Sequence, residues 1–317
     1  MHHLNFTRFL KTSCLPLLSL AVSCSIVAPV RSQSVLESPA AKVERVADGF
    51  QFTEGPAVDA KGNVFFTDQP NDQIMKLDVD GKLSQFMIPA GRSNGLFFSN
   101  EGALIACADE KNQMWEIQMD GSKRVLFEGF EGNKLNGPND VWIDSNGRIY
   151  FTDPYYQRPW WQHKKQPQPK QAVYRVDSDG ESITMMDDTL VQPNGIVGDA
   201  KRRLLFVADI GDSKTYQYTI ASDGALVDRV LFCKSGSDGM TLDSEGNLYL
   251  TGGKGVTVYN KEGKMVELIP VPESWTANVC IGGRDRKTLF ITASDSLYSI
   301  RIRNAGLVND SASDIQP

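Results

Sequence analysis

Short stretches of alternating apolar and polar residues, separated by Gly and Asp turns, recur along the chain from about residue 42 onward. In segment 136–154, NGPNDVWIDSNGRIYFTDP, two apolar runs flank a turn of the Asp-x-x-Gly kind. Such alternation with these turn residues predicts antiparallel strands joined as β-hairpins. No stretch shows the periodicity of an amphipathic helix, so an all-β fold is expected.

The hairpin of segment 136–154 is one copy of a repeat. Each copy has a polar pair, an apolar strand, a turn and a second apolar strand, and the other five copies are 53–68, 93–109, 193–209, 237–253 and 277–294. Two more strands follow each copy, which makes four strands per unit. Six units predict a six-bladed β-propeller with four antiparallel strands per blade. Segment 42–52 is expected to add an outer strand to the last blade and close the ring.

A polar residue leads each repeat, and the first strand of a propeller blade lines the central channel. These lead residues are therefore expected to form a ring at one mouth of the channel: Glu54, Asn94, Asn139, Asn194, Asp238 and Asn278. All six carry oxygen donors, which suits Ca²⁺, Mg²⁺ or Mn²⁺ better than a tetrahedral zinc site. The competing interpretation is structural, because Asn-Gly and Asp-Gly pairs are common in turns and Asn side chains cap strand backbone.

Composition adds two limits. The chain has 317 residues, a net charge of −6 and no basic tract beyond Lys164–Lys165, which argues against a nucleic-acid partner. Cys107, Cys233 and Cys280 are odd in number and far apart, so buried free thiols are expected, with one bridge plus one free thiol as the alternative. A monomer or a weak homodimer is expected.

The N-terminal residues have the pattern of a secretory signal peptide. Arg8 and Lys11 precede an apolar run that ends in small residues near Ser32, and the run is too short for a stable membrane span. This predicts a signal peptide over residues 1–32, a propeller domain over 33–317, and export to the periplasm or the medium. Cys24 in LAVSC leaves lipoprotein anchoring as an alternative.

Several motifs resemble those of the SMP-30/gluconolactonase family. They are EGP at 54–56, LNGPNDV and YFTDP within 135–154, PNGI at 193–196 and SDGM at 237–240, and the similarity extends over about residues 45–302. Members of that family are six-bladed propellers with one divalent cation at the channel mouth. The resemblance therefore implies a gluconolactonase-like carboxylic ester hydrolase that acts on a small sugar lactone.

Carried over position by position, the resemblance makes four of the lead residues metal ligands: Glu54, Asn139, Asn194 and Asp238. Ca²⁺ is the first choice for the cation, with Mg²⁺, Mn²⁺ or Zn²⁺ as alternatives. The other two lead residues, Asn94 and Asn278, are expected either to support the metal ligands from behind or to face the substrate.

Further substrate contacts are expected around Asn139. Some animal members of the family have an Arg two residues before the central Asn, where this chain has Gly137, and Lys134 is a candidate replacement. Asn136 is a second candidate for substrate binding. Asn136 and Asp140 can also orient Asn139 from behind.

The long insertion 155–171 is expected on the same face as the lead residues. Tyr155 and Trp160, with Trp161, can form a lid whose aromatic rings stack on a sugar. A packed surface loop is the competing interpretation. Trp275 is expected near the same mouth.

The hydrolytic base is expected to be a carboxylate or a water activated by the metal, because His163 is the one histidine outside the leader and lies in the polar insertion. Asp238 is the first choice. Asp153, which ends the strand after Asn139, is the second choice. An Asp occupies the same place in three other blades, so a structural role for Asp153 is the competing interpretation.

Two other functions stay open at this point. The first is a phosphotriesterase or a different lactonase on the same scaffold, which only a substrate panel would separate. The second is a non-catalytic ligand-binding propeller. The ring of acids and amides argues against the second, because a scaffold has no need of metal-type donors at its channel mouth.

Overall fold

The computed structural model describes residues 1–4 and 34–307. The chain divides into two units, Met1–Gln33 and Ser34–Pro317, and the fold below belongs to the second. The predicted signal peptide lies almost entirely outside the described residues, so it stays a prediction. None of the helices in the described part is long and apolar enough to span a bilayer.

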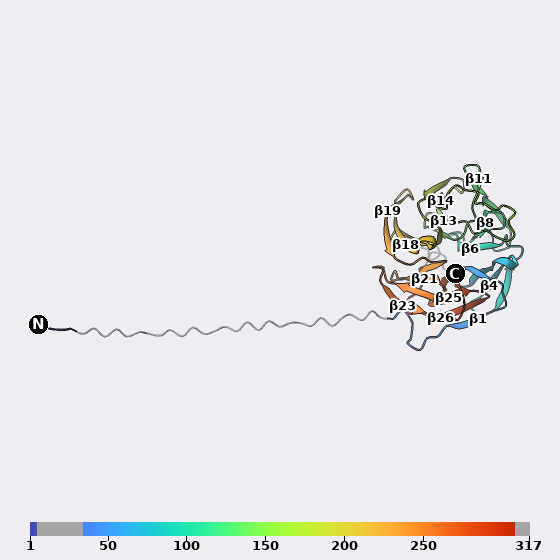
Figure 1. Ribbon diagram of the computed structural model, residues 1–317. Helices are drawn as coiled ribbons and strands as arrows, with labels where there is room; N and C mark the ends of the chain where they lie inside the picture. Colours follow the sequence, from blue (N-terminus) through green and yellow to red (C-terminus); the bar gives the residue numbers. More distant parts are fainter. Residues whose placement is uncertain (5–33, 308–317) are drawn as a thin grey trace. The chain divides into compact units, whose positions relative to one another are not determined.

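The predicted six-bladed β-propeller is confirmed. Six antiparallel sheets of four strands surround a central channel (Figure 1). In five blades the strands follow chain order from the inner strand outward, and in the last blade the outer strand comes from the start of the unit. The inner strands of neighbouring blades contact one another around the whole ring. The six inner strands are β2, β6, β12, β16, β20 and β24.

The first three blades hold the strands from β2 to β15, in chain order. They are β2 (Thr53–Val58), β3 (Val64–Asp68), β4 (Gln73–Leu77) and β5 (Leu83–Met87); β6 (Ser93–Phe98), β7 (Leu104–Ala108), β8 (Gln113–Ile117) and β9 (Lys123–Phe127); and β12 (Val141–Ile143), β13 (Ile149–Asp153), β14 (Ala172–Val176) and β15 (Ile183–Asp187).

The last three blades complete the ring. They are β16 (Pro193–Asp199), β17 (Leu204–Asp209), β18 (Lys214–Ile220) and β19 (Leu226–Cys233); β20 (Met240–Leu242), β21 (Leu248–Gly252), β22 (Gly255–Tyr259) and β23 (Met265–Ile269); and β24 (Thr276–Gly282), β25 (Thr288–Ala293), β26 (Ser296–Arg301) and β1 (Glu44–Ala47).

Strand β1 closes the ring as predicted for segment 42–52. It pairs antiparallel with β26 through Glu44↔Ser299 and Arg45↔Tyr298, so the first strand of the unit becomes the outer strand of the last blade. A β-strand from the start of the unit thus pairs with the last strand of the same unit. This pairing closes the ring between the first and last blades.

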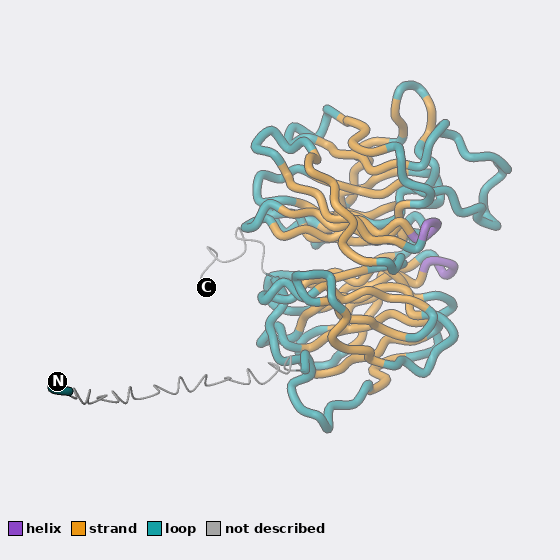
Figure 2. Tube along the Cα trace, turned by 60° about the vertical axis from the view of Figure 1, so that its left-hand side comes forward, coloured by secondary structure: helices purple, strands orange, loops and turns teal. Residues whose placement is uncertain are grey.

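Four short elements of the described chain lie outside the blades. The 3₁₀ turns η1 (Gln69–Asn71) and η2 (Ile210–Asp212) follow the second strands of blades one and four, and Figure 2 shows both on the same side of the propeller. A small hairpin of β10 (Gly129–Phe130) and β11 (Asn133–Lys134) links blades two and three. The repeat pattern did not predict this hairpin.

Asp-x-x-Gly turns connect many of the strands by one recurring contact. Oδ1 of Asp59 accepts hydrogen bonds from the backbone N–H groups of Lys61 and Asn63, each at 2.9 Å. Asp144 and Asp243 make the same pair of bonds in their own turns. The carboxylates therefore satisfy turn backbone, as Asx turns do.

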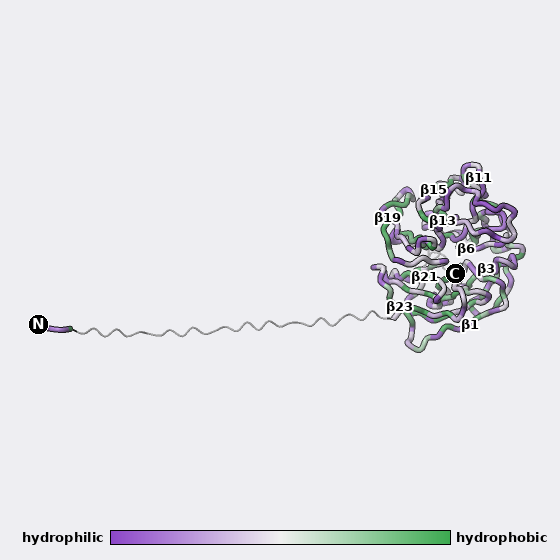
Figure 3. Tube along the Cα trace, in the orientation of Figure 1, coloured by the Kyte–Doolittle hydropathy of each residue, from purple (hydrophilic) through white to green (hydrophobic). Residues whose placement is uncertain are grey.

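The core consists of hydrophobic layers between neighbouring blades. Trp142 of β12, for example, packs with Leu205 and Phe206 of β17. Hydrophobic stretches run through the blades, while hydrophilic stretches gather in the loops, most visibly around β11 (Figure 3). Cys107, Cys233 and Cys280 are buried free thiols, as expected from their spacing.

The Thr-Asp pair that ends several second strands ties the ring together. The hydroxyl of Thr152 donates to the backbone oxygen of Asn194 in the next blade at 2.7 Å, and Thr67 donates likewise to Asn94 at 3.1 Å. Each of these bonds fixes the backbone of a lead residue. The blade-to-blade contacts therefore set the positions of the side chains at the channel mouth.

Candidate active site at the channel mouth

The six lead residues all lie at the starts of the inner strands, and therefore at one end of the channel. This end is the mouth of the channel. Glu54, Asn94, Asn194 and Asn278 lie within the first residues of their strands, and Asn139 and Asp238 stand just before theirs. Five of the six are buried, and Asp238 is half-buried.

Glycine after a lead residue lets neighbouring blades approach closely. A Cβ atom at Gly55 would lie 2.0 Å from the backbone oxygen of Asn94, and one at Gly239 would lie 2.0 Å from the side-chain amide of Asn278. Any larger residue would push the lead residue of the next blade outward. The Glu-Gly and Asp-Gly pairs of the sequence thus serve close packing around the mouth.

A hydrogen-bond network joins three blades and the insertion at the mouth. Asn194 Nδ2 donates to Asp238 Oδ1 at 2.8 Å and to the hydroxyl of Tyr156 at 2.9 Å. Trp275 Nε1 donates to Asp238 Oδ2 at 2.6 Å. Both oxygens of the Asp238 carboxylate are therefore held by N–H donors, which fixes the plane of the group.

Glu54 and Asp238 are close enough for their charges to interact strongly. Burial raises the pKa of Glu54 well above its usual value, and the nearby charge of Asp238 raises it further. Burial also raises the pKa of Asp238, while the bonds from Trp275 and Asn194 oppose that rise. Two carboxylates that share a buried site call for a positive partner.

Asp140, the residue after Asn139, contacts two other blades through Ile196 and Asn278. Its Oδ1 accepts from the N–H of Val141 at 3.0 Å, and its Oδ2 is 3.5 Å from Nδ2 of Asn278. Burial raises the pKa of Asp140 to about 7. The charge of Asp140 also raises the pKa of Glu54, which places a third carboxyl group near the site.

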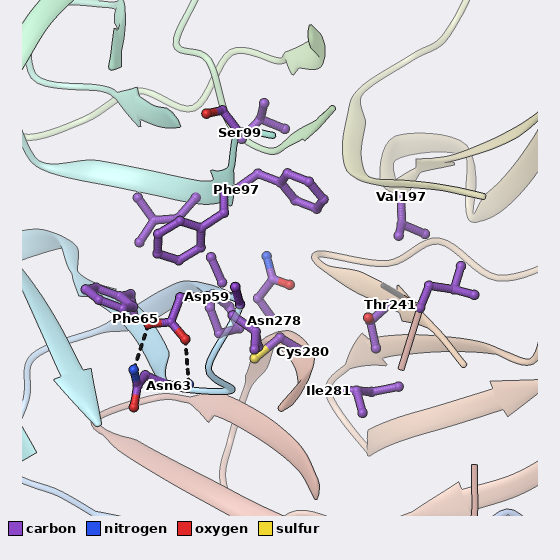
Figure 4. A pocket seen from close by; sticks show the side chains of 18 of the residues that line it. Asp59, Asn63, Phe65, Phe97, Ser99, Val197, Thr241, Asn278, Cys280 and Ile281 are labelled. Carbon is purple, nitrogen blue, oxygen red and sulfur yellow. Dashed lines mark hydrogen bonds between the residues drawn. The ribbon is translucent and has the colours of Figure 1, made fainter. Parts of the chain in front are cut away.

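A cavity of about 500 Å³ opens on the other side of Asp140, away from the mouth. Figure 4 shows Phe65, Phe97, Val197 and Ile281 along its wall. Of the lead residues, only Asn278 lines this cavity. The cavity is therefore separate from the carboxylates at the mouth.

The donors at the mouth fit a hard divalent cation. Asn194 Oδ1 is buried and has no hydrogen-bond partner in the part of the chain that the structure describes. The side-chain amide of Asn139 makes no hydrogen bond within the described residues, although its backbone is held by Thr152 and Gly95. The described residues contain no group of three or more His, Cys, Asp or Glu side chains that could hold a metal ion. The set at the mouth instead combines two carboxylates with amide oxygens, which Ca²⁺ and Mg²⁺ accept.

Asn136 has structural contacts rather than a free face toward the mouth. Its Nδ2 donates to the backbone oxygen of Lys170 at 2.8 Å, and its Oδ1 accepts from the N–H of Gln168 at 2.9 Å. The side chain is completely buried. Asn136 therefore holds the end of the insertion against the propeller, a different role from the predicted substrate contact.

Asp153 also makes hydrogen bonds that hold the backbone. Its two oxygens accept the N–H groups of Asn136 and Gly137 at 2.8 and 2.9 Å. Asp209 holds the N–H groups of Val191 and Gln192 in the same way. Burial outweighs these bonds and raises the pKa of Asp153 to about 7. This pattern favours the structural interpretation.

The replacements Asp153→Asn and Asp209→Asn are expected to have matching effects. Each places an amide NH₂ against a backbone N–H, which costs about 1–3 kcal/mol of unfolding free energy. Both variants should melt at a lower temperature and keep lactone turnover within about tenfold of the unchanged protein. A much larger loss of turnover in Asp153→Asn alone would contradict the structural role and indicate that Asp153 takes part in the reaction.

Most of the aromatic side chains predicted to form a lid pack on one another. The rings of Tyr155 and Trp161 stack at 5.9 Å, and those of Trp161 and His163 at 4.6 Å. Trp161 Nε1 donates to the backbone oxygen of Asp109 at 2.8 Å. Trp161 also occupies the space beside Gly137, where a Cβ atom would lie 2.7 Å from its ring. These rings dock the insertion on the propeller.

Two other residues that were predicted to contact the substrate, Trp160 and Lys134, lie in different surroundings. Trp160 faces the guanidinium group of Arg92, 4.8 Å from its ring centre. Lys134 is exposed on β11. Burial lowers the pKa of His163, and the charge of Lys134 lowers it further. Sequence reasoning missed Tyr156 and Arg158, whose positions in the insertion carry no repeat pattern.

Comparison with known proteins identifies the family to which the chain belongs. The profile of the SMP-30/gluconolactonase/LRE-like region matches residues 52–295, so the chain belongs to this family. A gluconolactonase from Zymomonas mobilis is 26% identical over 296 residues, which span 83% of this chain and 82% of the relative.

Solved structures agree with the fold. The X-ray structure of a proposed gluconolactonase has a TM-score of 0.80 and 30% identity, and the match covers 86% of this chain and 96% of that chain. A gluconolactonase of Xanthomonas campestris has a TM-score of 0.78 and 26% identity, covering 83% and 90%.

Proposed function

We propose that the chain is a metal-dependent lactonase that opens a sugar lactone of the gluconolactone kind. Its main support is the mouth itself, where Glu54 and Asp238 share a buried site with the unpartnered Oδ1 of Asn194. Family membership and the gluconolactonase relatives support the same reaction. Glu54, Asn139, Asn194 and Asp238 would hold the cation, with Ca²⁺ as the first choice.

A divalent cation held there would polarise the lactone carbonyl and stabilise the negative charge that develops on it. The protein orients its own groups for this step. Asn194 and Trp275 hold the Asp238 carboxylate in a fixed plane. We assign Asp238 as the base that accepts the proton of the attacking water at a carboxylate oxygen, because it is the half-buried member of the ring.

The insertion completes the site. The hydroxyl of Tyr156 contacts Asn194. Burial raises the pKa of Tyr156, and the nearby charges of Asp238 and Glu54 raise it further. Tyr156 therefore stays neutral near pH 7 and covers the site with an uncharged ring. Covering the carboxylates in this way excludes water and strengthens the charge interactions at the mouth.

A substrate panel tests this proposal. The purified protein with added Ca²⁺ should open D-glucono-δ-lactone well above the spontaneous rate in a pH-stat. γ-Lactones and a phosphotriester such as paraoxon form the other arms. Faster turnover of the phosphotriester would favour a phosphotriesterase. No turnover of any lactone with Ca²⁺, Mg²⁺, Mn²⁺ or Zn²⁺ would favour a non-catalytic ligand-binding propeller.

A further inference from the structure

Arg158 in the insertion places a partly free guanidinium group beside the mouth. Its Nε donates to Asp109 Oδ2 at 2.7 Å, and the side chain is 20% exposed. Its two terminal nitrogens, Nη1 and Nη2, make no hydrogen bond to the residues the structure describes. They therefore remain available as a planar pair of donors.

Asp109 binds side chains, including that of Arg158, where the equivalent residues of three other blades bind backbone. In blades one, three and four the equivalent carboxylate accepts backbone N–H groups two and three residues before the lead residue, as Asp68 does for Gln51 and Phe52. In blade two Asp72 performs this task, since its Oδ1 accepts the N–H of Arg92 at 2.6 Å.

Because Asp72 holds that loop, the Asp109 carboxylate is free for side chains. It accepts from Gln69 Nε2 at 3.0 Å and from Arg158, and its other oxygen has no hydrogen-bond partner among residues 1–4 and 34–307. The side chain of Asp109 is 1% exposed. A buried carboxylate released from its usual structural contact and paired with one guanidinium group fixes the direction of that group.

A chain of contacts leads from Arg158 to the predicted metal ligands. The guanidinium carbon lies 5.5 Å from the ring centre of Tyr156, and the Tyr156 hydroxyl bonds to Asn194, which bonds to Asp238. These contacts place the guanidinium group of Arg158 beside the mouth.

We propose that Arg158 is a substrate-binding residue that selects polyhydroxylated lactones, and that Asp109 positions it. Nη1 and Nη2 donate hydrogen bonds to hydroxyl oxygens of the substrate, while the lactone carbonyl faces the lead residues. This inference rests on the proposed lactonase function, and it names the part of the substrate that the insertion recognises. Two parallel donors on one rigid plane suit neighbouring hydroxyl groups.

A pair of substrates tests the proposal. D-Glucono-δ-lactone carries the ring hydroxyls, and δ-valerolactone has the same ring without them. In Arg158→Gln, kcat/KM for gluconolactone should fall about 10- to 100-fold, as expected for lost hydrogen bonds to a charged group. The value for δ-valerolactone should change less than about threefold. Asp109→Asn should shift the ratio of the two values in the same direction, mainly through KM.

Controls separate substrate binding from docking of the insertion. Lys165→Gln removes an exposed cation from the same insertion and should leave both substrates unchanged. Arg158→Lys keeps the charge without the planar pair of donors and should recover only part of the selectivity. Equal losses on both lactones in Arg158→Gln, or no loss on gluconolactone, would overturn the proposal.

A binding measurement keeps this test independent of turnover. Calorimetric titration with D-glucono-δ-lactam, an amide analogue with the same ring hydroxyls, should give a Kd about tenfold weaker for Arg158→Gln than for the unchanged protein. An unchanged Kd would overturn the role of Arg158 whatever the hydrolytic rates are. Binding of the lactam without hydrolysis of any lactone would instead contradict the proposed lactonase function and leave Arg158 as a ligand contact.

Discussion

Glu54→Gln and Asp238→Asn are each expected to reduce lactone hydrolysis at least about 1,000-fold, which corresponds to roughly 4 kcal/mol of transition-state stabilisation. Each change removes one of the two carboxylates at the mouth and keeps nearly the same side-chain shape. The proposed cation then loses half of its charged ligands. Initial rates in a pH-stat with saturating Ca²⁺ measure the loss, and Glu262→Gln, on an exposed turn, is the matched control.

The same Glu54→Gln change is expected to stabilise the metal-free protein. The folded-state pKa of Glu54 is raised by burial and by Asp238, so at pH 8, above the pKa of Glu in the unfolded chain, this carboxyl group destabilises the folded state relative to the unfolded state. The neutral amide removes that penalty. In EDTA at pH 8 the variant should therefore melt above the unchanged protein. A lower melting temperature together with full activity would contradict the account of Glu54.

Chelation is the second change with a large expected effect. Treatment with EDTA should abolish lactone hydrolysis and lower Tm, because a cation that binds only the folded state stabilises it by about 2.7 kcal/mol at 100 times its Kd. Ca²⁺ should restore both properties. Differential scanning fluorimetry and pH-stat assays on the same samples measure the two effects.

Glu54→Gln supplies the control for chelation. A variant that no longer binds the cation should show the same Tm with and without EDTA. If EDTA-treated protein hydrolyses gluconolactone at the untreated rate, the metal-dependent mechanism is wrong. If EDTA lowers Tm equally in Glu54→Gln, the stabilising cation binds somewhere other than the mouth.

The repeat made the fold and the ring of lead residues predictable. Six copies in one phase place Glu54, Asp238 and the four Asn residues at equivalent positions, and equivalent positions in a propeller meet at one mouth. The closure by β1 was predicted from segment 42–52, a strand-like segment that precedes the first repeat. Local strand signals and the global ring agree at each of these points.

The contacts of the insertion could not be predicted in the same way. Residues 155–171 have no counterpart in other blades, so nothing in the repeat indicates that Arg158 and Tyr156 turn toward the mouth while Tyr155 and Trp161 pack on each other. The exchange of roles between Asp72 and Asp109 likewise depends on a contact between two blades. Such contacts follow from packing, which residue type alone does not determine.

Asn136 shows a limit of motif reasoning. Its place three residues before Asn139 suggested a substrate contact, yet its side chain holds the backbone of the insertion. Small polar residues next to a functional position serve the loop as often as the ligand, because every buried backbone group in the loop needs a partner.

Anomalous diffraction from crystals grown with Mn²⁺ tests the central claim most directly. The account predicts one strong manganese peak at the mouth, within bonding distance of oxygens from Glu54, Asn139, Asn194 and Asp238. The peak should be absent from crystals of Glu54→Gln grown in the same way. No peak at the mouth of the unchanged protein, with these four side chains left in contact with water alone, would contradict the account.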